Sequence, residues 1–330
     1  MRIKERLGKY MNTRQRPTAI DISNWLFDDE YDSIYPKGAR DKKAIISPKI
    51  CQHPCIVKNH RYLLKKSSHR YPDQFWIEII AYQLGCLMNI PVPPSFVAID
   101  QFGQIGALIE WFYDDKNTHF LEYIDGGDLI MGYIPDFDRK KGEKHNFETI
   151  MQIMNSFAHD SHYLCSENWK EYWAKVFVFD AVTGNTDRHQ DNWGICLYKT
   201  DSNKTLIQLS PAFDNGTSMG HEIIEQNIHL FKNLGKIQKY IQKGTNHMKW
   251  HIDDPSRMNH IDFLCNYIHI YPETKSIVMS SLQFDLDHFK TMLNSLIMID
   301  VPVTLTQNKL WLIFNLIKLR REMILKRIGG

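Results

Sequence analysis

The spacing of apolar residues divides the chain into two regions of different character. Between residues 31 and 115 the apolar positions alternate or form short runs, which end in turn-forming residues such as Pro, Asn and Asp. Runs of this kind are typical of β-strands. They predict strands in the segments AIISP, CIVKN, RYLLKKS, SFVAID and GALIEWF. Residues 71–94 differ, because their apolar residues recur at helical spacing before a Pro-rich end, so one helix interrupts the strands.

Beyond residue 116 the apolar spacing becomes helical over most of the chain. Long periodic stretches predict helices at residues 147–160, 166–184 and 306–328. Residues 193–216 are the exception, since two short apolar runs joined by the polar turn KTDSNK predict a β-hairpin. The pattern therefore predicts an α+β protein in which a small β-rich lobe precedes a larger, mostly helical lobe with one hairpin.

The same pattern gives the expected boundaries. We place the β-rich amino-terminal lobe at residues 31–115 and the helical carboxy-terminal lobe at residues 116–330. Residues 1–30 carry several charges and little periodicity, so we expect them to form a loosely docked arm.

The composition excludes several classes of protein. Apolar residues make up 43% of the 330 residues, as in ordinary globular proteins. The 40 basic and 38 acidic residues leave a formal charge of +2, which gives no general attraction to nucleic acids or anionic membranes. We find no signal-peptide core and no run of membrane-spanning length, so we expect a cytoplasmic protein, or one delivered into another cell, without membrane contact.

The cysteines do not predict a metal site or a disulfide framework. All six are scattered through apolar segments, which suits reduced thiols. The cluster CQHPC places His53 between Cys51 and Cys55, but no second ligand pair follows at a matching spacing. We therefore expect no zinc site here.

A polar cluster after the helix predicted at 166–184 carries the main chemical signal. Asp187 and Asn192 are five residues apart in DRHQDN, the separation between the catalytic-loop Asp and Asn of protein kinases. A phosphoryl-transfer site needs a carboxylate that orients the attacking hydroxyl and neutral and acidic oxygen ligands for Mg²⁺. Asp187 suits the first role, Asn192 the second, and Asp214 in FDNG, at the far end of the hairpin, supplies the acidic ligand.

The alternative for this cluster is an ordinary polar turn, in which Asn and Asp satisfy the backbone. The five-residue spacing, the hairpin and the acidic residue at its end favour the catalytic interpretation. His189 is a candidate catalytic residue, although we prefer a role in bracing the loop. Asp180 and Asp191 carry less weight, and Asp191 could be a solvated turn residue.

The β-rich lobe offers groups that could bind phosphates. Lys65 ends a predicted strand, and Glu78 in the following helix could hold it in an ion pair. The alternative is that both are solvated surface residues. The segment around Gly38, Arg40 and Lys42 could cover phosphates with backbone N–H groups and cations.

In this order and spacing, the motifs resemble those of the HipA-like serine/threonine kinases of bacteria, whose fold is related to that of protein and phosphatidylinositol kinases. The resemblance extends from about residue 31 to the end, and the ordered set is more specific than any single motif. It rests on the segments YLLKK, AYQLGCLMNIPVPP, ALIEWF, TGNTDRHQDNWG and SPAFDNG.

The resemblance implies a two-lobed kinase-like fold and a kinase that uses ATP and Mg²⁺ to phosphorylate a protein substrate. It implies Asp187 as catalytic base, Asn192 and Asp214 as metal ligands, and Lys65 as the phosphate-binding lysine. It also implies that the backbone of Glu110 to Phe112 binds adenine. Members of this family act as toxins with an antitoxin partner or as delivered effectors, and this chain looks like the compact form without the extra amino-terminal subdomain.

Two other functions stay open at this point. A phosphoinositide kinase is suggested by the D-R-H loop and by the basic segment KLRREMILKR in the last predicted helix. A kinase-like binding module without catalysis is the other, although Lys65, Asp187, Asn192 and Asp214 are all present.

Overall fold

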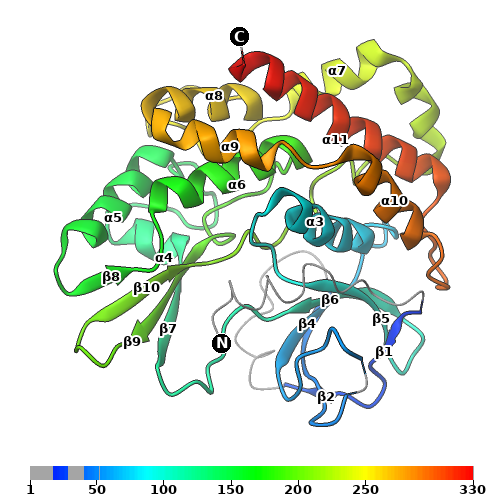
Figure 1. Ribbon diagram of the computed structural model, residues 1–330, viewed down its shortest axis with the longest axis horizontal. Helices are drawn as coiled ribbons and strands as arrows, with labels where there is room; N and C mark the ends of the chain where they lie inside the picture. Colours follow the sequence, from blue (N-terminus) through cyan, green and yellow to red (C-terminus); the bar gives the residue numbers. More distant parts are fainter. Residues whose placement is uncertain (1–17, 29–40, 52, 330) are drawn as a thin grey trace. The chain divides into compact units, whose positions relative to one another are not determined.

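The chain folds into two compact units, each assembled from three stretches of sequence. The computed structural model describes residues 18–28, 41–51 and 53–329 (Figure 1). The first unit consists of Met1–Asp114, Asn215–Asn233 and Phe284–Leu316. The second unit consists of Asp115–Asp214, Leu234–Gln283 and Ile317–Gly330. Apolar spacing alone divides the chain only once, near residue 115, and does not reveal that the chain returns twice to the first unit.

The first unit is built on a six-stranded sheet. Its strands are β1 (Ile20–Asp21), β2 (Leu26–Phe27), β3 (Lys42–Ile46), β4 (Arg61–Lys65), β5 (Ser95–Ile99) and β6 (Ile105–Glu110). Their order across the sheet is β1-β5-β6-β4-β3-β2. Strand β1 runs parallel to β5, and the other neighbours are antiparallel.

One of the predicted strands is wrong. The segment CIVKN at residues 55–59 is a turn, in which the Ile56 N–H donates to the His53 carbonyl at 3.2 Å. The turn ends at Asn59, whose φ of 51° is left-handed. Cys55 and Ile56 are buried, so the apolar run reflects a turn that packs into the core.

The described part of the expected arm is paired into the sheet. Strand β1 pairs with β5, and Ile22 and Trp25 are buried. The Trp25 ring lies edge-on to Tyr62 of β4, with 5.6 Å between the ring centroids. Residues 18–28 are therefore part of the first unit, whereas residues 1–17, 29 and 30 of the expected arm lie outside the described residues.

Helix α3 (Phe75–Met88) packs against β5 and β6 (Figure 1), and most of its side chains are buried. It begins where the Phe75 N–H donates to the Ser67 hydroxyl at 2.8 Å, and it ends at Asn89, which adopts the left-handed conformation typical of a helix end. The other helices with residues in this unit are η1 (Glu225–Lys232), α10 (Leu286–Leu296) and α11 (Gln307–Ile328), whose last residues belong to the second unit.

The second unit combines a four-stranded sheet with helices. Its strands, in the order β7-β9-β10-β8, are β7 (Phe120–Asp125), β9 (Gly194–Lys199), β10 (Thr205–Leu209) and β8 (Tyr163–Cys165). The predicted hairpin is present as β9 and β10. The sequence does not predict its two flanking strands, because β8 has only three residues and the pairing of β7 is irregular between Phe120 and Glu122.

The helices of the second unit include the two that the sequence predicts at residues 147–160 and 166–184. They are α4 (Gly126–Met131), α5 (Phe147–His159), α6 (Trp169–Thr183), α7 (Leu234–Lys243), α8 (His260–Ile270), η2 (Pro272–Thr274) and α9 (Lys275–Ser281). The predicted α+β class is confirmed, since each unit joins a sheet to helices. None of the described helices combines the length and apolar character needed to cross a membrane.

Helix α6 lies in the core of the second unit. Twelve of its fifteen residues are buried, including Trp173, Phe177 and Asp180. A helix that is apolar on all sides must be covered on all sides, and α6 packs against α8 and α9. The loop that follows α6 therefore starts from a fixed point.

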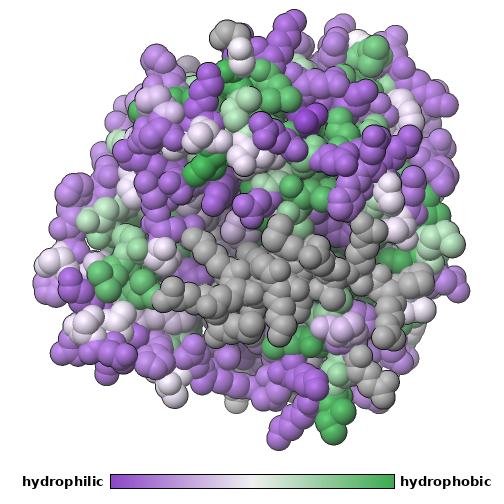
Figure 2. All heavy atoms as spheres, viewed as in Figure 1, coloured by the Kyte–Doolittle hydropathy of each residue, from purple (hydrophilic) through white to green (hydrophobic). Residues whose placement is uncertain are grey.

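Hydrophilic residues cover much of the face shown in Figure 2, with apolar residues in small groups between them.

Candidate active site

The loop at residues 185–192, which follows α6, is braced by its own hydrogen bonds. The Asp187 N–H donates to Asn185 Oδ1 at 3.0 Å, and the His189 N–H donates to the Asp187 carbonyl at 2.8 Å. The Asn192 N–H then donates to the His189 carbonyl at 2.9 Å. Helix α6 ends at Gly184, whose φ of 68° is left-handed, so the chain turns sharply into this loop.

The loop brings Asp187 and Asn192 together. The Asn192 side chain is buried, and its Nδ2 donates to the Asp187 carbonyl at 2.7 Å. Because the amide nitrogen is used in this bond, the side-chain oxygen Oδ1 is the atom that could ligate a cation. The predicted pair of a carboxylate and an amide oxygen is thus held within one loop.

His189 has the geometry of a bracing residue. Its Nδ1 accepts from the Asp191 N–H at 3.1 Å, so the ring proton of the neutral imidazole lies on Nε2. Its ring lies edge-on to that of His247, with 5.8 Å between the centroids. Burial lowers the pKa of His247 to about 3, helped by the charge of Arg257 and by His189. Burial, with His247 next, also holds the pKa of His145 well below its usual value.

Arg188 and Asp180 form a buried ion pair that the sequence analysis missed. Arg188 Nη2 lies 2.7 Å from Asp180 Oδ1, and Arg188 Nε lies 3.1 Å from Oδ2. Both side chains are fully buried, at 1% and 0% exposure. Burial raises the pKa of Asp180, and the Arg188 guanidinium opposes that shift. A signal was present in the sequence, because an acid within the apolar run VFVFDAV indicates a buried partner.

The β9–β10 hairpin brings the chain back to the 185–192 loop. The Ser210 N–H donates to the Gly194 carbonyl at 2.9 Å, so residues after β10 stay beside the start of β9. Arg188 Nη1 donates to the Asn192 carbonyl at 3.3 Å and also to the Phe213 carbonyl. Asp214 follows with a left-handed φ of 54°, a conformation that Asp tolerates better than most residues.

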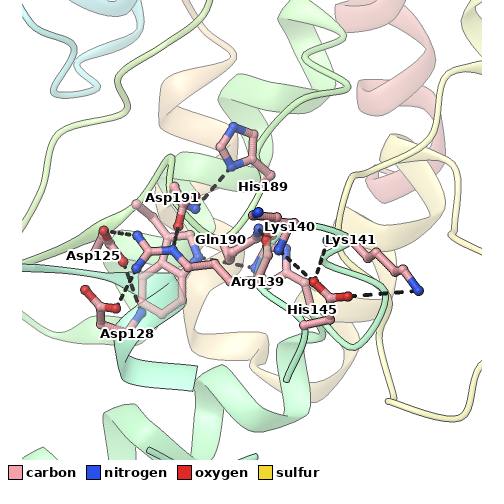
Figure 3. Close-up of polar contacts among 11 residues, drawn as sticks. Asp125, Asp128, Arg139, Lys140, Lys141, His145, His189, Gln190 and Asp191 are labelled. Atoms are coloured by element: carbon pink, nitrogen blue, oxygen red, sulfur yellow. Dashed lines mark hydrogen bonds and ion pairs between the residues drawn. The ribbon is translucent and has the colours of Figure 1, made fainter. Parts of the chain in front are cut away.

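A cluster around Arg139 supports the loop from another side (Figure 3). Arg139 points toward Asp125, Asp128 and Asp191, and its Nε lies 2.8 Å from Asp191 Oδ1. The Gln190 side chain donates to the Arg139 carbonyl. Asp191, which the sequence analysis treats as a possible solvated turn residue, is therefore ion-paired and half-buried.

A second group of predicted residues lies within the first unit. Lys65 Nζ lies 2.8 Å from Glu78 Oε1, and both side chains are buried, at 4% and 3% exposure. The predicted ion pair is thus present, and the solvated alternative is wrong. Glu78 Oε2 accepts from the Asn215 N–H at 3.0 Å, and Gln74 Nε2, one turn earlier on α3, donates to the Gly216 carbonyl at 2.9 Å. Asn215 directly follows Asp214 in the sequence.

The remaining predicted nucleotide-binding residues are only partly described. Gly38 and Arg40 lie outside the described residues. Lys42 is the first residue of β3 and is the cross-strand partner of Lys65, so both lysines lie at the same end of the strand pair. At the end of β6, the Trp111 N–H donates to the Arg61 carbonyl at 3.1 Å, and His60 Nε2 donates to the Trp111 carbonyl at 2.9 Å.

Within the predicted adenine-binding segment, Glu110 and Phe112 flank this anchored residue. The Glu110 N–H donates to the Pro94 carbonyl at 2.8 Å, and its buried carboxylate accepts from the Tyr62 hydroxyl at 3.4 Å. The Phe112 ring is nearly parallel to that of Trp111, at a centroid distance of 6.3 Å. Neighbouring side chains and backbone thus fix the course of this segment.

The donor set suits magnesium better than zinc or iron. Asn192 and Asp214 supply hard oxygen atoms, and Mg²⁺ commonly takes one or two protein oxygens together with phosphates and water. Among the described residues, no group of three or more His, Cys, Asp or Glu side chains is placed to hold a metal ion.

Comparisons with known proteins agree with these features. A model of the family described as HipA-like C-terminal domain matches residues 34–260. The serine/threonine-protein kinase CtkA of Helicobacter pylori is 25% identical over 153 residues. That match covers 46% of this chain and 43% of CtkA, so in sequence it spans less than half of that relative.

Two solved structures share the fold. A crystal structure of the Helicobacter pylori proinflammatory kinase CtkA has a TM-score of 0.66 at 14% identity, covering 94% of this chain and 96% of that chain. HipA of Shewanella oneidensis MR-1, in a complex with HipB and operator DNA, has a TM-score of 0.50 at 12% identity, covering 100% and 72%. The predicted kinase-like fold is confirmed by these matches.

Proposed function

The chain belongs to the HipA-like C-terminal domain family, and from this premise we propose that it is a serine/threonine protein kinase that transfers the γ-phosphoryl group of Mg-ATP to a protein. The observation that carries the proposal is the braced loop of the second unit. There Asn192 is hydrogen-bonded to the Asp187 carbonyl, and Arg188 joins the loop to the residue before Asp214. Phosphoryl transfer needs this kind of carboxylate and oxygen-ligand set.

In the proposed reaction, Asp187 orients a Ser or Thr hydroxyl and accepts its proton as the new O–P bond forms and the bond to the ADP oxygen breaks. Asn192 Oδ1 and the Asp214 carboxylate would hold Mg²⁺. When bound, Mg²⁺ neutralises charge on the phosphate oxygens. His189 keeps the loop in shape through its bond from the Asp191 N–H.

The first unit would contribute nucleotide binding. Glu78 holds the Lys65 ammonium at 2.8 Å, which presets it for contact with the α- and β-phosphates. Lys42 would add a second cation at the same end of the strand pair. The backbone of Glu110 and Phe112 would hydrogen-bond adenine, while both backbone groups of the intervening Trp111 are engaged within the unit.

We propose a protein acceptor rather than a phosphoinositide. The lipid-kinase alternative depends on the basic segment of α11, and two of its five cations are engaged inside the protein. Arg320 is buried and Arg321 Nε donates to the Leu282 carbonyl at 2.6 Å, whereas the exposed Arg327 lies 3.5 Å from the exposed Asp262. A membrane-binding helix presents its cations to the lipid headgroups. The proposed partner is the acceptor protein.

The decisive variant is Asp187→Asn. We expect it to abolish phosphoryl transfer, because the amide cannot accept the hydroxyl proton. The dissociation constant for nucleotide should stay within about threefold of the wild-type value, because Asp187 is not a proposed nucleotide ligand. Transfer is measured with labelled ATP and a cell lysate, and binding by the rise in melting temperature with Mg-ATP.

The outcomes separate the three functions. No label in any protein, with intact ATP binding, would contradict the kinase proposal and leave a binding module. Label that appears in phosphoinositide vesicles and not in proteins would favour the lipid kinase. Unchanged transfer by the Asp187→Asn variant would show that another group is the base.

A further inference from the structure

We propose that Arg188 is a positioning residue that sets the geometry of the two magnesium ligands, Asn192 and Asp214, and that Asp180 holds it in place. This inference rests on the proposed function, since it assigns a role within the metal site of that kinase. Arg188 would not touch the metal or the substrate. Arg188 would act through the backbone segments that carry the two ligands.

The guanidinium is fixed on one edge by a carboxylate. Its Nε and Nη2 reach the two oxygens of Asp180, at 3.1 and 2.7 Å. This two-pronged contact fixes the plane of the guanidinium, which a single contact would leave free to rotate. Asp180 is itself fixed, because it lies in the last turn of the buried helix α6. The position of Asp180 in the buried helix α6 thus sets the orientation of the Arg188 guanidinium.

The opposite edge of the guanidinium joins the two ligand segments. Nη1 donates to the carbonyl of Asn192 and to the carbonyl of Phe213. One nitrogen therefore links the backbone of the first proposed ligand to the peptide that precedes the second. The 185–192 loop and the end of the β9–β10 hairpin cannot separate without breaking one of these bonds.

The bond to Phe213 also bears on the conformation of Asp214. The Phe213 carbonyl and the Asp214 N–H belong to one planar peptide, so fixing the carbonyl fixes the plane from which Asp214 departs. Asp214 leaves that plane with a φ of 54°, a conformation that costs energy for a residue with a side chain. Such conformations persist where the surroundings over-determine them. Arg188 supplies one of those constraints.

The alternative explanation is purely structural, with Arg188 serving only to satisfy buried polar groups.

The test compares Arg188→Lys and Asp180→Asn with wild type. Lysine keeps the charge but has no fork that could bond Asp180 and both carbonyls together. Asparagine keeps the shape of Asp180 and removes its charge. Folding is checked by circular dichroism and cooperative unfolding, and binding of a non-hydrolysable ATP analogue is titrated in EDTA and at a series of Mg²⁺ concentrations.

We expect folded variants to bind the analogue in EDTA as wild type does and to need about tenfold more Mg²⁺ for half-maximal enhancement of binding. The Mg²⁺ concentration for half-maximal phosphoryl transfer should rise by about the same factor. Arg320→Lys is the matched control. Arg320 of α11 is also a buried arginine, and its Nη1 donates to the Ala181 carbonyl in the last turn of α6 at 3.4 Å.

Each outcome decides the matter. A folded Arg188→Lys variant with a wild-type Mg²⁺ requirement overturns the proposal, and so does an equal shift in Arg320→Lys. If neither Arg188→Lys nor Asp180→Asn folds, the pair serves folding and the positioning role is rejected. If the wild type shows no Mg²⁺-dependent binding, the proposed function itself fails, which is a separate result.

Discussion

At the scale of single residues, Glu78 makes two buried contacts within the first unit. One carboxylate oxygen lies 2.8 Å from Lys65, and the other accepts from the Asn215 N–H at 3.0 Å. The residue therefore orients the proposed phosphate-binding cation and fixes the backbone of Asn215. A solvated pair could do neither, because exposed ion pairs contribute little.

We predict that Glu78→Ala destabilises the protein by about 3 kcal/mol, because it leaves Lys65 buried without this carboxylate. It should also raise the ATP concentration needed for half-maximal transfer. Urea unfolding and ATP titration measure the two effects. The matched control is Glu273→Ala, which removes the exposed pair of Glu273 and Lys170 at 3.0 Å and should cost less than about 1 kcal/mol. Equal losses in the two variants would contradict the prediction.

Residue types and spacing indicated part of this site but could not show which side chains are buried. Lys65, Glu78, Asp187, Asn192 and Asp214 stand out because their spacing matches a chemical requirement. Arg188 does not, because its role depends on the direction that its side chain takes, and Asp180 within its apolar run indicates a buried partner without identifying it. Gln74 gives no signal in the sequence either, since its contact with Gly216 joins residues more than a hundred positions apart.

At the scale of elements, the junction between α6 and the 185–192 loop depends on Gly184. Its φ of 68° is left-handed, and a Cβ there would lie only 2.4 Å from Arg320 Nη2. Any other residue would thus be strained twice, by its backbone and by a buried guanidinium. The glycine allows α6 to end where the loop must begin.

We predict that Gly184→Ala costs at least about 2 kcal/mol and lowers the rate of phosphoryl transfer, because either the loop or Arg320 must move. Gly103→Ala is the control. Gly103 has a similar φ of 71°, but a Cβ there would meet nothing within 4 Å, so the variant should lose only about 1 kcal/mol. Chemical unfolding and a kinase assay on both variants make the comparison. Equal losses of unfolding free energy in the two variants would show that the Arg320 side chain moves away from the added Cβ at no cost.

Element types followed from the sequence wherever periodicity was long or the strand was flanked by clear turns. Helices α3, α5, α6 and α11 are all predicted, because each has a sustained apolar pattern. Strand β8 is not, since three residues are too few for a period, and it forms only because β10 offers a parallel edge. The tertiary partner decides such short elements, so the sequence around them carries little signal.

At the scale of the whole molecule, the return of the chain to the first unit is the feature that local patterns could not show. Residues 215–233 and 284–316 belong to the same compact unit as the six-stranded sheet. Buried contacts explain why: Trp76 Nε1 donates to the Val303 carbonyl at 3.0 Å, and buried Lys309 donates to the Ile223 carbonyl at 2.9 Å. Such pairings join distant segments and leave no periodic trace.

The buried histidines of the second unit make the stability of the protein depend on pH. Burial lowers the pKa of His260 to about 4, with Arg320 adding to the effect, and burial lowers the pKa of His247 to about 3. Both values lie below the value of about 6.5 expected in the unfolded chain. The unfolded state therefore binds more protons below that pH, and the folded state loses stability as the pH falls from 6.5 toward 4.

Each such histidine should remove about 1.4 kcal/mol of unfolding free energy per pH unit within this window. We predict that His247→Gln flattens the decline by about that amount between pH 6 and pH 4, since glutamine does not titrate. Urea unfolding at pH 8, 6, 5 and 4 measures the slope. The values at pH 8 give the intrinsic effect of the substitution, because both imidazoles are neutral there in either state. An unchanged slope in the variant would mean that His247 takes up its proton without unfolding, through an opening of its surroundings.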